Sequence, residues 1–343
     1  MNSDATNYSW PKQNFDSWLE QIKKENPNLD VDQLDRKIDD SIAVKAFPFF
    51  SNVTTASTIF SESLTNRPWK CGISIHITNP KTDNSFLLHA LENGADYVHF
   101  DCPSYLNQDQ LNILLKDVQI EFITSHWQVQ NDESFQFIKN YLKDKSQKAT
   151  FFISQLHSEQ LALSNSRCIS LVIYNTESWG KALSQLLASL SKAASQVENI
   201  IFTIILGNDF ILNISAVRAL KLVLVKLELV LQTTLNPYFE LTVDPNILGN
   251  SIHSNLIRMS SIALSAALTN PDALILPPAD QSQEIKNSKW LRSSIHLMQI
   301  LQHESFLNRT LYPLAGSYCI EDLTEQIARQ LWDSIQLNIS HDS

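Results

Sequence analysis

Short apolar runs alternate with amphipathic segments along the chain from Trp69 onward. Each run has the length of a β-strand and is almost continuously apolar, as expected for parallel strands that are buried on both faces. The runs are residues 71–77, 96–100, 120–124, 150–154, 170–175, 200–206, 239–243 and 272–277. The intervals between them have helical spacing. The pattern therefore predicts an α/β fold, an eight-stranded parallel β/α (TIM) barrel over residues 66–343, with an open parallel sheet as the alternative that periodicity does not separate.

The first 65 residues follow a different pattern. Helical spacing runs over residues 15–38 with a break at Pro27, and Pro48 excludes a helix from the apolar stretch 44–50. We expect residues 1–65 to form a helical and extended N-terminal arm that the barrel itself does not require. Aromatic side chains such as Trp18 and Phe47 need a surface for burial, and such residues are enriched in interface cores. The arm is therefore predicted to pack either on a partner or back on its own barrel, and an arm that extends away from the barrel implies a partner surface.

Composition and charge narrow the class of protein. Acidic residues outnumber basic residues by 36 to 26, which argues against a general binder of nucleic acid or anionic membranes. No run reaches the roughly 18 apolar residues of a membrane span, and the N-terminus has no apolar signal segment, so we expect a cytoplasmic protein. The chain has six glycines and no phosphate-binding loop motif, and its four cysteines lack metal-ligand spacing. The sequence therefore predicts no metal site.

Several short motifs occur in a fixed order along the chain. After the sixth predicted strand, residues 207–220 read GNDFILNISAVRAL, and near the end residues 313–324 read PLAGSYCIEDLT. These segments resemble G-x-D-F-F-x-E-I-A-K-L-R-A-L and P-x-G-G-S-Y-Y-I-E-x-L-T of the methylmalonyl-CoA mutase family. Residues 255–266 are similar to the family's N-x-x-R-T-x-x-x-x-x-S-A, and Arg67-Pro68-Trp69 to its R-P-W. The resemblance covers residues 40–338 and rests on the ordered set of motifs rather than on one of them.

The resemblance implies radical chemistry that interconverts methylmalonyl-CoA and succinyl-CoA, with adenosylcobalamin as the source of the radical. It also implies a barrel threaded by the pantetheine arm of the substrate. The family's cobalamin-binding loop, D-x-H-x-x-G, does not occur in this sequence. We therefore expect that this chain binds no cofactor and that adenosylcobalamin is held by a partner subunit.

The candidate site residues follow from the same resemblance. The family's seventh strand carries a substrate-contacting histidine, and Phe239 stands at that position, so no catalytic residue is predicted. Met298 stands where the family has a polar glutamine. Three residues are candidates for a remaining substrate contact: His126, expected just after the third strand, and Arg258 and Arg292, in segments similar to family motifs.

Other polar residues have structural interpretations that we favour. Arg218, like Arg258, lies in an apolar helical segment and is expected to pair between helices rather than bind a CoA phosphate. His76 and His99 are expected to be core or rim residues whose hydrogen bonds are satisfied, rather than general acid–base groups. Asp209 is expected to cap the helix that begins at Phe210.

The resemblance implies a small, non-catalytic subunit that forms a heterodimer with the large, cobalamin-binding mutase subunit. An independent barrel enzyme without cobalamin is the alternative, and an acyl-CoA-binding barrel without catalysis is a third hypothesis. An independent enzyme requires titratable groups that converge at the barrel mouth, whereas the sequence shows only scattered candidates. With Phe239 and Met298 projecting into it, we expect a narrow and apolar mouth.

Overall fold

The computed structural model describes residues 14–38, 42–48, 68–145, 150–155, 168–173, 199–232, 234–282, 288–310 and 312–341. Its main element is an eight-stranded sheet with the order β6-β5-β4-β3-β10-β9-β8-β7. Every neighbouring pair with a described register in this sheet is parallel. The strands are β3 (Lys70–His76), β4 (Tyr97–Cys102), β5 (Thr124–Val129), β6 (Thr150–Gln155), β7 (Cys168–Ile173), β8 (Asn199–Leu206), β9 (Pro237–Val243) and β10 (Ala273–Ile275).

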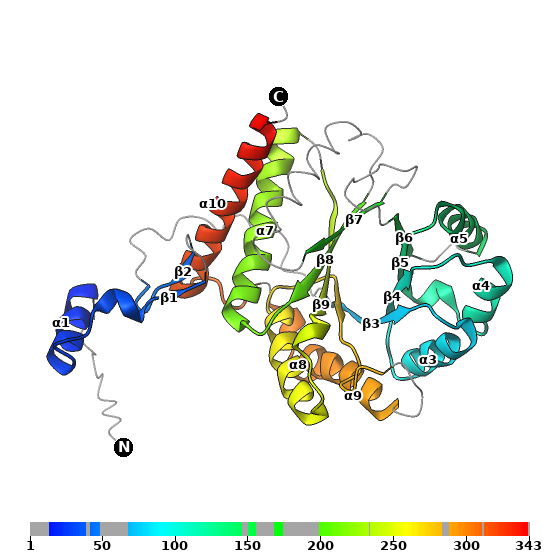
Figure 1. The fold of residues 1–343 in the computed structure, drawn as a ribbon, viewed down its shortest axis with the longest axis horizontal. Helices are drawn as coiled ribbons and strands as arrows, with labels where there is room; N and C mark the ends of the chain where they lie inside the picture. Colours follow the sequence, from blue (N-terminus) through cyan, green and yellow to red (C-terminus); the bar gives the residue numbers. More distant parts are fainter. Residues whose placement is uncertain are drawn as a thin grey trace, which may run out of the picture.

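Helices cover the outside of the sheet, which curls round on itself (Figure 1). They are α3 (Pro80–Glu92), α4 (Gln108–Leu114), α5 (Asp132–Lys145), α7 (Phe210–Leu231), α8 (Ile252–Ala267), α9 (Ser288–Gln299) and α10 (Tyr318–His341). Polar side chains start four of them: Asn79 caps α3, Asn107 caps α4, Asp209 caps α7 and Ser251 caps α8. The predicted capping role of Asp209 is confirmed.

The two ends of the sheet order, β6 and β7, lie close enough to contact each other. Among the strands that the structure describes, no hydrogen-bonded register joins this pair. The α/β class and the curled parallel sheet agree with the sequence prediction, and they are consistent with a barrel of the TIM type. Complete closure of the barrel stays a prediction.

One strand lies later in the sequence than predicted. Residues 120–124 were expected to form the third strand of the sheet, but Ile120–Phe122 is a 3-10 turn and β5 begins at Thr124. Ile120 and Ile123 are buried in the main core, which explains their apolar character without a strand. The strand itself reads TSHWQV and alternates, because every second side chain faces a polar interior rather than the helices.

The sheet separates two apolar clusters. A large cluster lies between the strands and the outer helices and contains, among others, Phe100, Trp127 and Phe202. A small cluster of Tyr97, Ala273 and Ile275, with Tyr238 packed against it, is separate from the large one. We call the space enclosed by the curled sheet, which holds this small cluster, the lumen.

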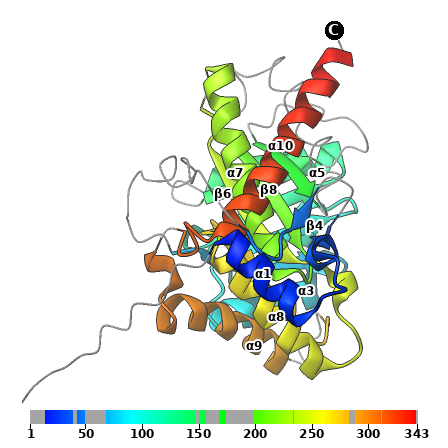
Figure 2. The same cartoon turned by 90° about the vertical axis from the view of Figure 1, so that its left-hand side faces the viewer.

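The N-terminal arm is described only in part, because residues 1–13 (which include Trp10), 39–41 and 49–67 lie outside the described ranges. Helix α1 (Phe15–Glu25) has no buried residue and lies to one side of the sheet (Figures 1 and 2). The two-stranded ribbon of β1 (Arg36–Lys37) and β2 (Ala43–Val44) does touch the helical layer. Arg36 pairs with Asp209 at the start of α7, and the backbone of Ala43 exchanges hydrogen bonds with the Gln326 side chain on α10. No helix among the described residues is long and apolar enough to span a membrane.

Candidate functional site at the mouth of the lumen

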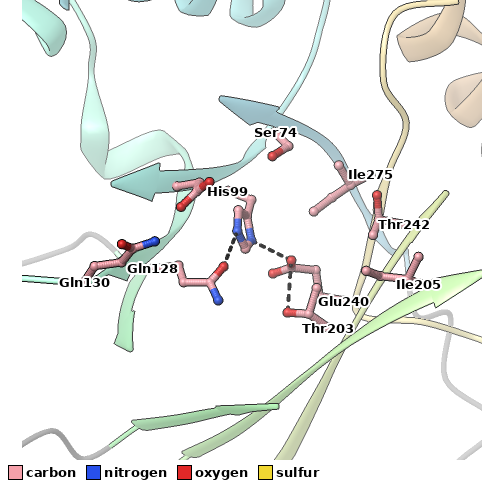
Figure 3. Close-up of a pocket in the computed structure, with 10 residues that line it drawn as sticks. Ser74, His99, Gln128, Gln130, Thr203, Ile205, Glu240, Thr242 and Ile275 are labelled. Carbon is pink, nitrogen blue, oxygen red and sulfur yellow. Dashed lines mark hydrogen bonds and ion pairs between the residues drawn. The ribbon is translucent and has the colours of Figure 1, made fainter. Parts of the chain in front are cut away.

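A cavity of about 410 Å³ lies at the carboxyl ends of the strands (Figure 3). This is the face at which β/α-barrels carry their sites. Most of the residues that line it are polar and come from alternate positions on five strands and the segment after β5: Ser74, Asp101, Gln128, Gln130, Thr203 and Thr242. Ile205 and Ile275 supply apolar lining. Phe239 and Met298, which were expected to make the mouth apolar, do not line it, so that part of the prediction is wrong, whereas the expected narrowness stays a prediction.

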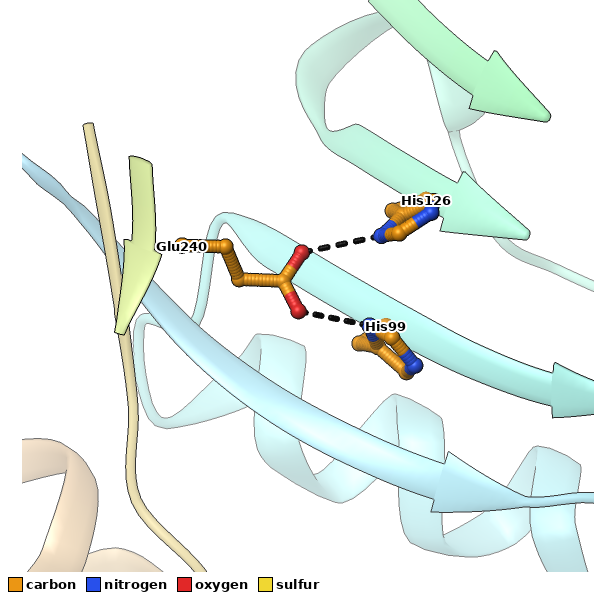
Figure 4. A group of neighbouring side chains, drawn as sticks. All are labelled: His99, His126 and Glu240. Carbon is orange, nitrogen blue, oxygen red and sulfur yellow. Dashed lines mark hydrogen bonds and ion pairs between the residues drawn. The ribbon is translucent and has the colours of Figure 1, made fainter. Parts of the chain in front are cut away.

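The carboxylate of Glu240, on β9, lies at the base of this cavity and is the centre of a buried hydrogen-bond network. His99 on β4 donates from Nδ1 to Oε1 at 2.7 Å, and His126 on β5 donates from Nδ1 to Oε2 at 2.9 Å (Figure 4). Tyr97 Oη donates to Oε2 at 2.5 Å, and Thr203 Oγ1 to Oε1 at 3.3 Å. Glu240 and His126 have no exposed surface, and His99 is buried as well. Four donors therefore compensate the cost of burying one carboxylate.

The pKa values in the network divide the two histidines. Burial alone would raise the pKa of Glu240, but the charges and hydrogen bonds of His99 and His126 hold it well below its ordinary value. Burial opposes charge on His99 too, yet Glu240 raises the pKa of that imidazole above its usual value. The pKa of His126 is lowered, because burial outweighs the raising effect of Glu240 and the charge of His99 lowers the pKa further. The network therefore favours charge on the Glu240 carboxylate and favours it more on His99 than on His126.

The outer nitrogens of both imidazoles also have partners. Nε2 of His99 lies 3.2 Å from Gln128 Oε1, and Nε2 of His126 lies 2.9 Å from Ser154 Oγ. The two rings meet edge to face, with their centroids 4.7 Å apart. Each Nε2 atom is bonded to its own partner, and both Nδ1 atoms point toward the Glu240 carboxylate. Among the described residues, His99, His126 and Glu240 are the group whose ligand atoms lie close enough to hold a metal ion.

Aromatic side chains fill the lumen on the other side of Glu240. Tyr97 and Tyr238 come two positions before His99 and Glu240 on their strands, so they lie nearer the amino ends. Their rings stack at 5.9 Å, and Phe152 packs on Tyr238 at 4.8 Å. Gly72 leaves room for this packing, since an added Cβ would lie 2.7 Å from Ile275 Cγ1 and 3.1 Å from Tyr97 Cδ1. These aromatic rings therefore pack together on the amino-end side of Glu240, although none of them lines the cavity.

The structure places the three predicted substrate contacts apart from one another. His126 is not at the rim after its strand: it lies within β5, fully buried, in contact with Glu240. The predicted position was wrong because the strand was placed four residues too early. Arg258 on α8 and Arg292 on α9 are exposed on the outer helices, and neither lines the cavity.

Phe239 does not project into the mouth, which corrects the prediction for that residue. It is buried in the main core, where its ring stacks on Phe202 at 5.5 Å and Lys221 Nζ lies 4.7 Å from its centroid. Met298 is also buried in the main core, on α9. Successive side chains of a strand face opposite sides, so the lumen-facing residue of β9 at this level is Glu240. Whether Phe239 replaces a catalytic histidine stays a prediction.

Glu240 was missed from the sequence, although a signal was present. Histidine or glutamate lies in the middle of three buried strand segments, YVHFD, TSHWQ and YFELT. A buried strand tolerates such a residue only when a partner is supplied from another strand. Three interruptions at a similar depth in their strands indicate a shared polar layer.

The motifs that carried the family resemblance lie in the helical shell. Arg218 on α7 and Glu321 on α10 form a buried ion pair at 2.7 Å, which confirms the predicted pairing of Arg218. Asn213 binds the backbone of Gly207 through its amide, and Asn255 does the same with Gly249. These motif residues hold loops and helices in place and do not line the cavity.

Comparison with known proteins supports the resemblance over part of the chain. Residues 192–340 match the family model of methylmalonyl-CoA mutase. The Escherichia coli (strain K12) methylmalonyl-CoA mutase is 38% identical over 84 residues, which are 24% of this chain and 12% of that protein. The methylmalonyl-CoA mutase small subunit of Porphyromonas gingivalis is 30% identical over 80 residues, 23% of this chain and 13% of that protein.

Among solved structures, a Yersinia pestis DHPS with a pterine-sulfa conjugate aligns with a TM-score of 0.42 and 11% identity, over 71% of this chain and 95% of that one. The sequence matches are the more informative ones, although they span only about an eighth of the length of the curated relatives. From the last residues before β8 through nearly all of α10, the chain is similar to methylmalonyl-CoA mutase.

Proposed function

We propose that this chain is a non-catalytic barrel subunit of a methylmalonyl-CoA mutase-type assembly, paired with a large subunit that holds adenosylcobalamin. The match over residues 192–340 and the similarity to small subunits support the family part of the proposal. The observation that carries the non-catalytic part is the filled lumen. A pantetheine arm that threads the barrel needs an open axis, whereas here Tyr97, Tyr238 and Phe152 occupy it below the buried Glu240.

The arm supports the proposed partner. Phe15 and Trp18 on α1 form an aromatic cluster with Phe47, in which Trp18 stacks on Phe47 at 5.1 Å. Phe15 is exposed, and α1 buries no residue on its own chain. An aromatic, amphipathic helix held beside the barrel by the β1–β2 ribbon is suited to the surface of a second subunit.

Co-expression with a large mutase subunit tests the proposal. We expect a 1:1 complex in analytical ultracentrifugation and isomerisation of methylmalonyl-CoA by the complex when adenosylcobalamin is present. The isolated chain should bind neither adenosylcobalamin nor acyl-CoA. Turnover of methylmalonyl-CoA by the isolated chain would refute the non-catalytic role, and the lack of any complex would refute the partner.

A second function is favoured by one observation, the convergence of titratable groups at the cavity. His99, Glu240 and Asp101 all line it, which is what an independent barrel enzyme acting on a small polar substrate requires. The aromatic rings of Tyr97, Tyr238 and Phe152 limit such a substrate to the mouth. Protection of the isolated chain against thermal unfolding by a panel of small carbonyl compounds would support this function over the first.

A further inference from the structure

We propose that His99, His126 and Glu240 form a binding site for a first-row divalent metal ion, for which zinc is the probe. Two imidazoles and one carboxylate are a donor set that such ions accept. The three residues come from three different strands, so the rigid sheet rather than a loop sets their geometry (Figure 4). The site is independent of the proposed partner and of cobalamin.

The distances are close to those of a coordinated ion. One ligand atom from each residue can be chosen so that all three lie within 4.8 Å of one another. Ligands at the zinc distance of about 2.1 Å are separated by about 3.0–3.4 Å for bond angles between a right angle and the tetrahedral value. The two Nδ1 atoms lie 2.7 and 2.9 Å from the two different oxygens of the carboxylate, so an ion would replace these hydrogen bonds and the three side chains would adjust around it.

The groups behind the ligands are those that a metal site needs. A coordinating imidazole ordinarily donates its other N–H to a fixed acceptor, which sets its tautomer and orientation. With Nδ1 on the ion, Nε2–H of His99 donates to Gln128 Oε1 and Nε2–H of His126 donates to Ser154 Oγ. Tyr97 Oη donates a hydrogen bond to the Glu240 carboxylate from the amino-end side of the lumen. Both outer acceptors that the imidazoles would need are thus in place.

The site also has room for a fourth ligand. Two of the three residues, His99 and Glu240, line the 410 Å³ cavity together with Thr203 (Figure 3). His126 is fully buried behind them. An ion held by three protein groups would thus face the cavity on one side, where water or a small oxygen ligand completes its coordination. This is the arrangement of an open site, in contrast to a closed structural one.

Metal binding by the isolated full chain tests the inference, so failure to find a mutase partner would not affect the result. The protein is prepared without a histidine tag, stripped with a chelator and titrated with Zn²⁺ against a chromophoric competitor. We expect one zinc per chain and an increase in the unfolding temperature with zinc concentration. Co²⁺ should give a d–d absorption spectrum typical of nitrogen and oxygen ligands.

Matched variants locate the ion. His99→Gln and Glu240→Gln should abolish stoichiometric binding, and Gln128→Leu should weaken it by about 10- to 100-fold through loss of the outer acceptor. His253→Gln removes an exposed histidine from α8 and should change nothing. Gln128 lies at the cavity, so its variant remains informative if the two ligand variants do not fold. A wild-type chain that stays metal-free in excess zinc, or that keeps its affinity in Gln128→Leu and any folded ligand variant, would overturn the inference.

Discussion

Arg218 Nη2 donates to Glu321 Oε1 at 2.7 Å, and the pair is almost completely buried between α7 and α10. The two residues are 103 positions apart and come from the two motif segments that most resemble the mutase family. Glu321 also accepts the backbone N–H of Gly316 at 3.0 Å, so the turn before α10 is tied to the same carboxylate. The motifs are therefore joined in space by a structural contact.

Breaking that pair should be costly. Arg218→Ala or Glu321→Ala leaves the other charge buried without its partner, and we expect a loss of about 3–5 kcal/mol in the free energy of unfolding. Arg329→Ala is the matched control, because Arg329 pairs with Glu325 on the exposed side of the same helix α10. That control should cost less than about 1 kcal/mol. Urea denaturation measures all three, and equal losses for the buried and exposed pairs would contradict the assignment.

The packing of Tyr97 and Ile275 in the lumen should not tolerate a methyl group at Gly72. An added Cβ would meet Ile275 Cγ1 at 2.7 Å and the backbone oxygen of Leu274 at 3.2 Å, so we expect Gly72→Ala to cost about 1–3 kcal/mol through overpacking. Gly207→Ala is the control, since nothing lies within 4 Å of its Cβ position. Thermal unfolding of the two variants side by side gives the comparison. A Gly72→Ala protein as stable as wild type would show that the side chains around Gly72 are loosely packed.

Asp209 has two roles that can be separated. It caps α7 by accepting the backbone N–H of Leu212, and it pairs with Arg36 of the arm. Asp209→Ala should cost about 0.5–2 kcal/mol from the lost cap. Arg36→Ala keeps the cap and should cost less than about 1 kcal/mol, because its guanidinium is half exposed.

The contribution of Asp209 should also depend on pH. Burial would raise its pKa, but the Arg36 guanidinium and the backbone N–H groups of α7 lower it below its ordinary value. A carboxyl group with a lowered folded pKa stabilises above its unfolded pKa of about 3.9 and loses this effect as the pH falls through the folded value. The stability difference between wild type and Asp209→Ala should therefore shrink below about pH 4. A difference that is constant from pH 7 to pH 3 would be inconsistent with this role.

The described cysteines should differ in reactivity. Burial raises the pKa of the Cys71 thiol to about 12 and that of Cys102 to about 12. Cys319 is only partly buried. Because the thiolate is the reactive form, a disulfide reagent at pH 8 should modify Cys319 much faster than Cys71 or Cys102. Peptide mass spectrometry assigns the sites, and reaction in urea, where these thiols should react alike, is the control.

Helix α1 should be dispensable for the barrel but not for the proposed partner. Deleting residues 1–30 removes α1 and leaves the β1–β2 ribbon, with its contacts to Asp209 and Gln326, in place. We expect an unchanged unfolding midpoint, since α1 buries no residue, and a loss of association with the large subunit. Phe15→Ser is a milder version that removes one exposed aromatic ring. A truncated chain that still forms the complex with equal affinity would show that docking occurs elsewhere.

Much of the fold could be predicted from the sequence because the helix-facing positions of strands such as β4, β8 and β9 are apolar. The run at residues 200–206 became β8 (Asn199–Leu206), and the helix after Asp209 begins where its cap predicts. β5 was misplaced because its lumen-facing positions are polar, which breaks the apolar run. The strand pattern also does not say which of two consecutive residues faces inward. Phe239 was expected at the mouth because the family resemblance aligns it with a substrate-contacting histidine, and Glu240 was not considered.

The buried network of Glu240, His99 and His126 was harder to predict, because its members come from three distant strands and only the register of the sheet brings them together. His99 was considered as a satisfied core residue, and its hydrogen bonds to Glu240 and Gln128 agree with that interpretation. Nothing in the local sequence of Glu240 identifies it as the common acceptor. Its role depends on the pairing of Tyr97 with Thr124 and of Thr203 with Glu240, which sets the depth of each strand in the sheet.

The separation of the two apolar clusters means that the positions on each strand form two independent sets. Side chains such as Ser74 and Thr242 line the cavity, whereas Phe202 and Phe239 pack in the outer core. Substitutions drawn from different sets share few neighbours, so their effects on stability should add. The scaffold can thus change its chemistry while its architecture is kept. A library randomised only at the cavity-lining positions Ser74, Gln130 and Thr242 should yield mostly folded chains, from which binders of new ligands could be selected.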